Sequence, residues 1–400
     1  MNIGIIAPFN PACIARYLYG KDIPSINNNA TAVNTLVVEF LRQGHTVKIF
    51  TLTPKAPHKY ETFKGKNVCV YLVPTGLFPR LCGYRQFKLW QFYLPQRLAR
   101  IVHKELNDLD VLHAHWTYEY AKAASLLSDE KKVFVTVRDW CPYQLGIMRG
   151  MKKIAWFLKY ITFKQVMTDD KITFVANSNY TYEKIVDAYP EKIIPIIPNP
   201  IDKSWILDKK KKQVSYNVIS IAQGLNSARK NIGKLLEAFC EYRKLFSNAQ
   251  LHLVGRYDKH SDMYINWKNN GWLEGVIFHG TMPHEELSAL LDEMSFMVHP
   301  AWEETFGNIL LEAMSRCVPC IGGEKSGAVP VVLGNGQYGL ICDINNSKSI
   351  LDAMIKMNDE KLSTAIQNRA TTMIKSTYSS EIIANRHIGL YMGKLDQHVL

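Results

Sequence analysis

Residues 299–333 read HPAWEETFGNILLEAMSRCVPCIGGEKSGAVPVVL. The apolar run Phe296–Val298 before them predicts a buried strand, and apolar side chains spaced three or four apart after Gly307 predict a helix. The stretch is therefore expected to form a strand, a loop and a helix. A helix N-terminus presents free backbone N–H groups and the positive end of the helix dipole, which suit a phosphate. Gly307 leaves that approach open because it has no side chain.

Two carboxylates bracket this turn. Glu304 lies in the loop before the helix, and Glu312 lies more than one turn inside it. Because a carboxylate can accept protons from two hydroxyl groups, an extended ligand with phosphates at the helix start and a hydroxylated ring near each Glu would fit. A nucleotide sugar has that form. The alternative is an ordinary strand and helix with two solvated glutamates. Glu303, next to Glu304, is expected to lie on the surface.

The stretch Glu304–Glu312, ETFGNILLE, resembles the E-x7-E signature of retaining glycosyltransferases of family 4 (glycosyl transferases group 1). The Leu-Glu-Ala-Met run around the second Glu and the glycines of residues 322–330, GGEKSGAVP, strengthen the resemblance. It implies the α/β GT-B fold, in which two Rossmann-like, doubly wound parallel-sheet domains face a cleft. The resemblance extends over nearly the whole chain and is most specific over residues 217–342.

The resemblance implies a role for each position of the motif. Glu304 would hold the donor sugar, and Glu312 would hold the ribose hydroxyls. The backbone of Phe306, Gly307 and Asn308 would meet the donor.

Other loops would complete the donor site. Lys230 and Arg229 would stabilise the diphosphate and, together with Glu304, would act as catalytic residues. Arg229 would replace an Arg that the family has at the position of Leu225. The loop around Gly280 and Met282 would hold the base. Ser326 and Gly327 would also line the donor site.

Strands and helices alternate along the chain, which favours parallel sheets covered on both faces. Three prolines at positions 195, 198 and 200 and the lysine run 209–212 indicate a hinge. We therefore expect an acceptor domain over residues 1–198, a donor domain over 199–375, and a C-terminal helix over 376–400 that packs back on the first domain. The expected strands are Asn2–Ala7, His45–Phe50, Asp110–Trp116, Val133–Trp140, Thr173–Ser178, Asn217–Ala222, Leu251–Gly255, Val276–Met282 and Phe296–Val298.

The first domain offers candidates for binding the acceptor or the sugar. His115 follows a predicted strand, and ligands of open α/β sheets bind at the carboxyl ends of the strands. Arg138 stands where many family members have a His that contacts the transferred sugar, so it is expected to bind an anionic acceptor or sugar. Asp139 would hold a hydroxyl or act as a base. Asn28 belongs to a loop that replaces the family's glycine pair. A structural role is the alternative for His115.

The basic charge lies in the first half of the chain. Residues 1–200 hold 26 Lys and Arg against 15 Asp and Glu, and residues 201–400 hold 22 against 21. Two segments there, Leu77–Ile101 and Met148–Gln165, mix basic and aromatic residues, which suits an anionic membrane surface. The alternative is helices that pack on a sheet with a solvated basic face. Nucleic acid is not expected because no recognition motif accompanies the charge.

The composition, 47% hydrophobic over 400 residues, indicates globular domains. The apolar run of residues 1–8 is too short for a signal segment and is expected to form a buried strand. No apolar run reaches membrane-spanning length, and the eight cysteines lack a disulfide framework. We therefore expect a cytoplasmic location, with possible peripheral binding to the cytoplasmic face of the inner membrane. No cofactor and no metal are expected, since no Asp-x-Asp pair is present.

These observations together predict a retaining hexosyltransferase. It would move a sugar from a UDP- or GDP-sugar to a hydroxyl of a saccharide acceptor, lipid-linked in the leading hypothesis, in the synthesis of a surface polysaccharide or lipopolysaccharide. A non-catalytic partner subunit that binds a nucleotide sugar is the alternative, suggested by Leu225 and Arg138. A Rossmann dehydrogenase is disfavoured because no GxGxxG follows the first strand.

Overall fold

The computed structural model describes residues 1–20, 22–26, 30–54, 60–75, 93–207 and 216–394. It divides into two compact units, residues 1–200 with 380–400 and residues 201–379. The predicted boundary at residue 198 lies close to the observed one. The final helix begins later than expected because a π-helical segment, Ile374–Tyr378, extends the preceding helix, and Ile201 N donates to Tyr378 O at 2.8 Å. This contact holds the segment in the second unit.

The first unit contains a seven-stranded sheet of order β3-β4-β2-β1-β5-β6-β7, in which all neighbouring pairs are parallel except β3 with β4. The sequence patterns did not predict this edge hairpin, which turns at Asn67 with a positive φ of 58°. The strands are β1 (Asn2–Ile6), β2 (Thr46–Thr53), β3 (Glu61–Gly65), β4 (Val68–Pro74), β5 (Val111–His115), β6 (Val133–Val137) and β7 (Ile172–Ala176).

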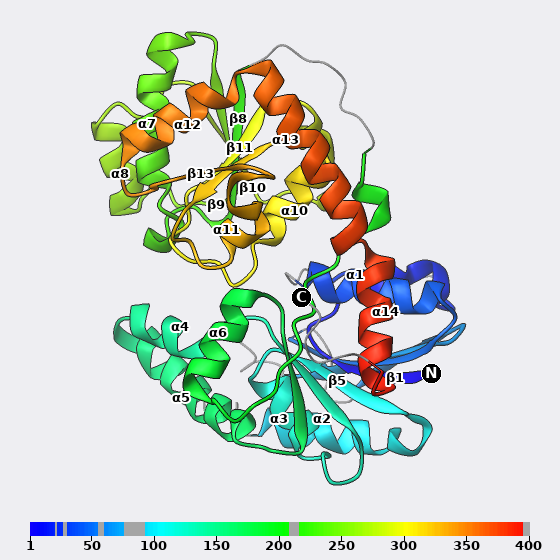
Figure 1. Ribbon diagram of the computed structural model, residues 1–400. Coiled ribbons are helices and arrows are strands. Elements are labelled where there is room, and N and C mark those ends of the chain that lie inside the picture. The colour runs from blue at the N-terminus through cyan, green and yellow to red at the C-terminus, as the bar shows by residue number, and fades with distance from the viewer. Residues whose placement is uncertain (21, 27–29, 55–59, 76–92, 208–215, 395–400) are drawn as a thin grey trace. The chain divides into compact units, whose positions relative to one another are not determined.

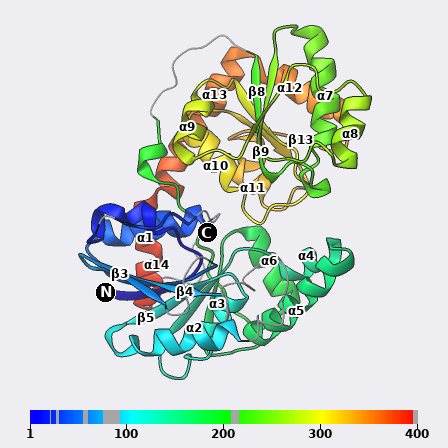
Figure 2. The same ribbon diagram turned by 180° about the vertical axis from the view of Figure 1, so that it is seen from behind.

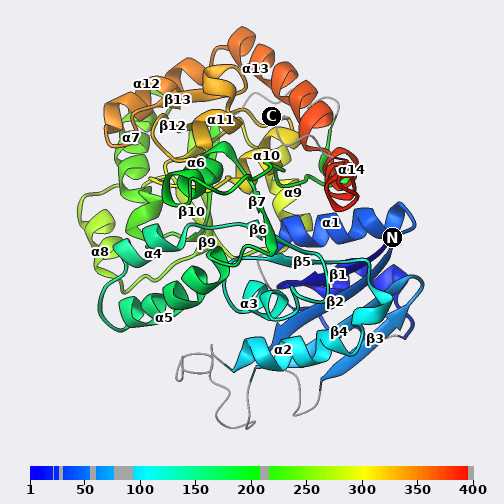
Figure 3. The same cartoon turned by 60° about the horizontal axis from the view of Figure 1, so that its bottom comes forward.

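Helices cover both faces of this sheet. Figure 3 shows α1 and α14 on one side and α2 and α3 on the other, and a separate apolar core fills each side. The helix α14 packs against α1, which agrees with the expected return of the C-terminal helix to the first unit. The helices are α1 (Thr31–Arg42), α2 (Leu94–His103), α3 (Glu119–Ser125), α4 (Cys141–Ile147), α5 (Gly150–Met167), α6 (Asn179–Ala188) and α14 (Ser380–Tyr391).

The second unit contains a six-stranded, fully parallel sheet of order β10-β9-β8-β11-β12-β13 (Figure 1). The strands are β8 (Asn217–Gly224), β9 (Gln250–Arg256), β10 (Val276–Gly280), β11 (Phe296–His299), β12 (Cys320–Gly323) and β13 (Leu340–Cys342). The helices are α7 (Ile232–Leu245), α8 (Asp262–Asn269), α9 (His284–Asp292), α10 (Asn308–Ser315), α11 (Val329–Val332), α12 (Ser347–Met357) and α13 (Glu360–Met373).

Helices lie on both faces of the second sheet (Figure 2). An apolar core fills each face: one contains side chains of α7 and α12, and the other contains side chains of α10, α11 and α13. Each unit is thus one doubly wound domain, which confirms the predicted pair. Because parallel strands β8, β11, β12 and β13 are neighbours, the loops at their carboxyl ends meet along one edge. Among the described residues, no helix is long and apolar enough to cross a membrane.

Two sequence predictions lie wholly or partly outside the described residues. Asn28 and the lysine run 209–212 are not described, and neither are residues 77–92 of the first basic segment. The rest of that segment forms most of α2, whose Leu98, Ile101 and Val102 are buried in the core. For this part, the packed-helix interpretation is therefore correct.

Candidate donor site and family

Three charged side chains predicted to work together meet at the carboxyl edge of the second sheet. Glu304 lies in the loop between β11 and α10, and Arg229 and Lys230 form a 3-10 turn after the neighbouring strand β8. Lys230 Nζ is ion-paired and hydrogen-bonded with Glu304 Oε1, and Arg229 Nη1 lies 3.6 Å from the same oxygen. These side chains are largely buried, with 11% of Lys230 and 18% of Glu304 exposed. The two cations therefore share the Glu304 carboxylate, and Arg229 also lies 3.6 Å from Glu303 Oε2.

The electrostatics keep Glu304 ionised. Burial by itself raises the pKa of Glu304, but the charge of Lys230 and the nearby His299 and Arg229 outweigh it, so the pKa lies well below its usual range. His299 is the last residue of β11, is 2% exposed, and places Nε2 3.3 Å from Glu304 Oε1. Burial lowers the pKa of His299, although Glu304 opposes this effect. A fixed negative charge thus stands beside two cations that can meet an anionic group.

The glycine-rich loop after β12 fixes the backbone of Glu304. Glu304 and Gly327 form a parallel bridge, and Ala328 N donates to Glu304 O at 2.9 Å. Gly327 has φ +63°, and a Cβ there would lie 2.4 Å from the Glu304 carbonyl oxygen. Only glycine fits this close approach without displacing the loop. Ser326, its predicted partner in the donor site, is fully buried, and its Oγ has no hydrogen-bond partner among the described residues.

Glu312 lies on α10 and faces a different environment from Glu304. It is 6% exposed, and burial raises the pKa of its carboxyl group to about 8. His284, the first residue of α9, places its Nε2 3.6 Å from Glu312 Oε1. Burial also lowers the pKa of His284. A buried carboxyl group without a strong ion pair is suited to hydroxyl groups, which it can accept or donate to.

The remaining predicted donor residues surround the start of α10 and the end of β10. Gly307 has φ +87° and precedes the first helical residue, Asn308, so the helix begins where the sequence predicts. The Phe306 side chain is buried in the core, which leaves its backbone to meet a ligand. Gly280 also has a positive φ, and no atom would contact a Cβ placed on it. Met282 packs against the same core as Phe306.

The prediction that Glu303 lies on the surface is wrong. Its side chain is buried, with 4% of the residue exposed, and its Oε2 lies 3.6 Å from Arg229 Nη1. Arg229 Nη1 also donates to the backbone carbonyl of Glu303. The reason is that the turn after β8 covers the acidic loop, a long-range contact that local sequence does not reveal. Leu225, at the position of the family's Arg, is fully buried in the core, so the positive charge here comes from Arg229.

The predicted acceptor residues of the first unit also meet one another. His115, at the end of β5, is fully buried, and its Nδ1 accepts hydrogen bonds from Arg138 Nε at 3.1 Å and Nη2 at 3.0 Å. Arg138 Nη1 donates to Asn199 Oδ1, and the guanidinium lies over the Trp116 ring. Burial lowers the pKa of Arg138 to about 9. The Arg138 guanidinium is therefore already bound to His115 and Asn199. To contact an anionic acceptor as predicted, it would have to bind the acceptor and these side chains at the same time.

Polar atoms nevertheless remain available here. His115 Nε2 and Asp139 Oδ1 are buried without a hydrogen-bond partner among the described residues. Burial raises the pKa of Asp139 to about 6, although the charge of Lys159 opposes this shift. His113, on the same strand as His115, has a structural role, since Tyr391 Oη lies 2.6 Å from its Nδ1 and Thr136 Oγ1 lies 2.8 Å from its Nε2. Buried polar atoms without partners are uncommon and indicate room for a ligand or water.

Sequence reasoning missed three side chains at these sites. His299 is the first residue of the stretch 299–333, and its position at the end of a predicted strand could have identified it as a site residue. His284 and Asn199 gave no such signal, because their contacts with Glu312 and Arg138 join segments distant in the sequence.

Comparisons with known proteins agree with the geometry. The family model for glycosyltransferase family 4 matches residues 30–205, and the model for glycosyl transferases group 1 matches residues 204–373. Together they span most of both units. The second match includes all the described donor-site residues above.

Curated relatives resemble the chain over most of its length. N-acetyl-alpha-D-glucosaminyl L-malate synthase of Bacillus anthracis is 25% identical over 92% of this chain and 94% of its own. Alpha-monoglucosyldiacylglycerol synthase of Streptococcus pneumoniae is 23% identical over 74% of this chain and 68% of its own.

Solved structures show the same fold. Sucrose-phosphate synthase from Thermosynechococcus elongatus superposes with a TM-score of 0.76 at 16% identity, with 98% of each chain covered. HepE from Anabaena, in complex with UDP and glucose, gives a TM-score of 0.67 at 14% identity over 99% of this chain and 100% of its own. The two Rossmann-like units therefore form a GT-B fold. Because the two family models together match residues 30–373, the chain belongs to the group 1, family 4 glycosyltransferases.

Proposed function

We propose that this glycosyltransferase uses a UDP- or GDP-sugar and transfers the sugar with retention of its anomeric configuration. The observation that carries the proposal is the cluster of Lys230, Arg229 and Glu304 at the carboxyl edge of the second sheet. Its two cations would offset the charge that builds up on a departing nucleoside diphosphate in a site with little water. HepE, which shares the fold, has been solved with UDP and glucose, and this favours UDP among the candidate nucleotides.

Glu304 would then bind the hydroxyls of the donor sugar, and Glu312 would bind the ribose. Lys230 and Arg229 also offer fixed positive charge in place of a metal ion, so the reaction is proposed to proceed without one. The acceptor would meet the first unit, where His115 Nε2 and Asp139 Oδ1 are buried and available. Asp139, with its pKa near 6, is suited to hold an acceptor hydroxyl.

The test is a screen of UDP- and GDP-sugars for slow hydrolysis by the full chain, with and without a chelator. Glu304→Ala and Lys230→Ala should each abolish the activity. Lys234→Ala is the control, because Lys234 is 42% exposed and pairs with Glu237 on the surface of α7. NMR of the first sugar released should show the anomer of the donor. Release of the opposite anomer, or loss of activity with the chelator, would contradict the proposal.

Binding of a nucleotide sugar without turnover, whatever acceptor is supplied, would instead favour the second candidate, a non-catalytic partner subunit. The observation behind this candidate is Arg138, which stands where many relatives have a sugar-binding His and which is occupied by His115 and Asn199.

We also propose that the acceptor is lipid-linked and that α5 meets an anionic membrane surface. The first half of α5 exposes three large apolar side chains, with exposed fractions of 77% for Met151, 56% for Ile154 and 52% for Phe157. The exposed Lys152 and Lys153 lie beside them. The second half, by contrast, buries Phe163 and Val166 in the core, so the apolar exposure is confined to one end. Apolar side chains flanked by lysines are typical of helices that lie at a charged membrane interface.

Liposome flotation tests this part. The chain should float with vesicles that contain anionic lipid and less with neutral ones, and replacement of Met151, Ile154 and Phe157 by Ser should abolish flotation. The control replaces Leu245 and Ile265, which are exposed apolar residues of the second unit. Equal flotation of the two variants would contradict the proposed surface. A membrane-bound acceptor would place the protein at the cytoplasmic face of the inner membrane, in the synthesis of a surface polysaccharide or lipopolysaccharide.

A further inference from the structure

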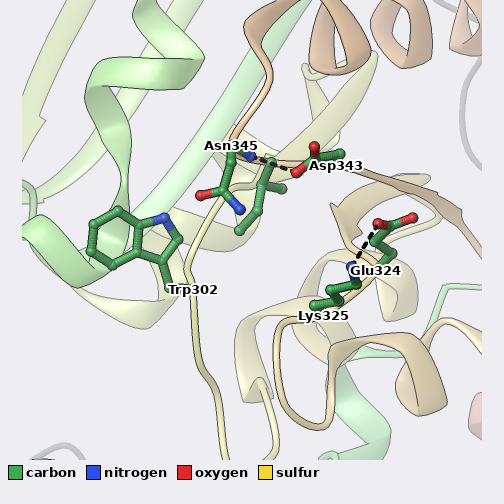
Figure 4. Close-up of a pocket in the computed structure, with 6 residues that line it drawn as sticks. Trp302, Glu324, Lys325, Asp343 and Asn345 are labelled. Carbon is green, nitrogen blue, oxygen red and sulfur yellow. Dashed lines mark hydrogen bonds and ion pairs between the residues drawn. The ribbon is translucent and has the colours of Figure 1, made fainter.

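A small cavity outside the donor residues opens at the same edge of the second sheet. It has a volume of about 160 Å³ and is lined by residues that follow three neighbouring strands. The lining residues are Trp302 after β11, Glu324 and Lys325 after β12, and Asp343, Ile344 and Asn345 after β13. In Figure 4 the Trp302 ring and the Glu324 carboxylate lie on opposite sides of Asn345. None of these residues has a role in the reaction described above.

The walls of the cavity are held in place. Trp302 N donates to the backbone carbonyl of Arg229 at 2.9 Å, and Glu324 N donates to Cys342 O at 3.0 Å. Asn345 N donates to Asp343 Oδ1 at 3.0 Å, which closes a tight turn (Figure 4). The buried Asn231 side chain donates to Ile344 O at 2.8 Å. The cavity wall is therefore held by backbone hydrogen bonds together with the side chains of Asn231 and Asp343.

The chemistry of the lining suits a sugar ring. Trp302 is 45% exposed and offers a flat apolar face, on which the C–H face of a pyranose can pack away from water. Carboxylates accept hydroxyl protons, and an amide both donates and accepts. Glu324 and Asp343 outnumber Lys325, so an anionic ligand would meet net repulsion. The volume is well below the roughly 300–1,000 Å³ of pockets that enclose a drug-sized ligand, which points to one ring and not to a whole nucleotide sugar.

The position links the cavity to the donor site. Trp302 and Glu304 belong to the same short loop, and Arg229 holds both, through its carbonyl to Trp302 and its guanidinium 3.6 Å from Glu304. From this geometry we propose that the cavity is a second saccharide subsite, which binds one neutral pyranose ring of the acceptor glycan. The identification of the ring as part of the acceptor rests on the proposed transferase function, whereas the binding of a neutral sugar does not.

The test is a titration of the full chain, followed by NMR of the tryptophan indole N–H groups, with D-glucose, D-galactose, D-mannose and N-acetyl-D-glucosamine at millimolar concentrations. The Trp302 signal, assigned by its absence in Trp302→Ala, should shift saturably with at least one sugar. Asp343→Asn and Glu324→Gln should weaken this binding at least fivefold. Asp352→Asn, an exposed carboxylate on α12 outside the cavity, should leave it unchanged.

Trp302→Phe keeps an aromatic face and should retain part of the affinity, which separates stacking from a general loss of structure. UDP should not displace the sugar. The subsite is overturned if none of the four sugars shifts the Trp302 signal, if UDP competes with them, or if Asp343→Asn behaves like Asp352→Asn. UDP binding, measured separately with Glu312→Gln, reports on the donor site, so failure of the proposed function would be seen independently of failure of the subsite.

Discussion

His299 Nε2 lies 3.3 Å from Glu304 Oε1, the oxygen that Lys230 also binds and that Arg229 approaches. One carboxylate oxygen is thus the common partner of three nitrogen groups. Glu304, with Glu303 beside Arg229, offsets the charge of these cations. If a nucleotide binds there as proposed, its affinity and the charge of Glu304 should be coupled.

Glu304→Gln should lower turnover of the donor about 100-fold, because the sugar loses a group that positions it. The affinity for UDP alone should stay the same or rise, since Lys230 loses its anionic partner and Arg229 loses Glu304 while Glu303 stays beside it. Calorimetric titration with UDP and a donor hydrolysis assay measure the two effects. Glu274→Gln is the control, because Glu274 pairs with Arg243 at 3.0 Å but is 81% exposed, and exposed pairs contribute little. Unchanged turnover with a tenfold loss of UDP affinity would contradict the assignment.

Gly327→Ala should displace Glu304. The substitution combines a positive φ, which costs about 1–2 kcal/mol for a residue with a side chain, with a Cβ placed 2.4 Å from the Glu304 carbonyl oxygen. Gly271→Ala has a similar φ of +71° with no atom near the added Cβ. Thermal unfolding and donor hydrolysis of both variants separate the backbone cost from the steric one. Gly327→Ala should lose activity and more stability than Gly271→Ala; equal activity in the two would exclude a role of this contact.

The affinity for UDP should depend on the ionisation of Glu312. Burial gives the free site a pKa of about 8, and ribose hydroxyls that donate to the carboxylate favour its ionised form, so the pKa should fall in the complex. Binding then releases a proton below pH 8, and affinity should rise with pH, by at most about tenfold per unit, until it levels off above pH 8. Glu312→Gln should bind UDP more weakly, and its affinity should lack this rise with pH. Any pH dependence that remains in the variant comes from other groups, including the phosphates of UDP, and can be subtracted.

The buried His387 should make the first unit sensitive to acid. Burial, together with the charge of Arg138, lowers the pKa of His387 to about 3, against 6.5 for an ordinary His. Between pH 6.5 and 3, His387 therefore binds a proton in the unfolded chain but stays neutral in the folded chain. His387 thus leaves stability unchanged with pH above 6.5 and lowers it as pH falls from 6.5 toward 3, at up to about 1.4 kcal/mol per pH unit.

Urea unfolding between pH 7 and 4.5 measures that slope. His387→Phe removes the titrating group and should flatten it, whereas His103→Gln, whose ring is 59% exposed on α2, should leave it unchanged. Identical slopes for wild type and His387→Phe would show that His387 does not carry the effect.

The sequence alone determined the alternation of strands and helices, the start of α10 at Gly307, and the grouping of Glu304 with Lys230. These follow from local patterns, since apolar periodicity and glycine positions act within a few residues of one another, and from the resemblance to the family. The β3–β4 hairpin was not predicted, because the place of β3 at the edge of the sheet is set by tertiary packing and not by a local sequence pattern.

Only the tertiary structure decided which side chains share an environment. The burial of Glu303 under Arg229, the contacts of His299 with Glu304 and of His284 with Glu312, and the cavity beside Trp302 all join loops that follow different strands. Their physical cause is the order of the parallel strands β8, β11, β12 and β13, which brings the carboxyl ends of distant segments together. Burial at that edge then sets the charge states, raising the pKa of Glu312 while the neighbouring cations hold that of Glu304 low.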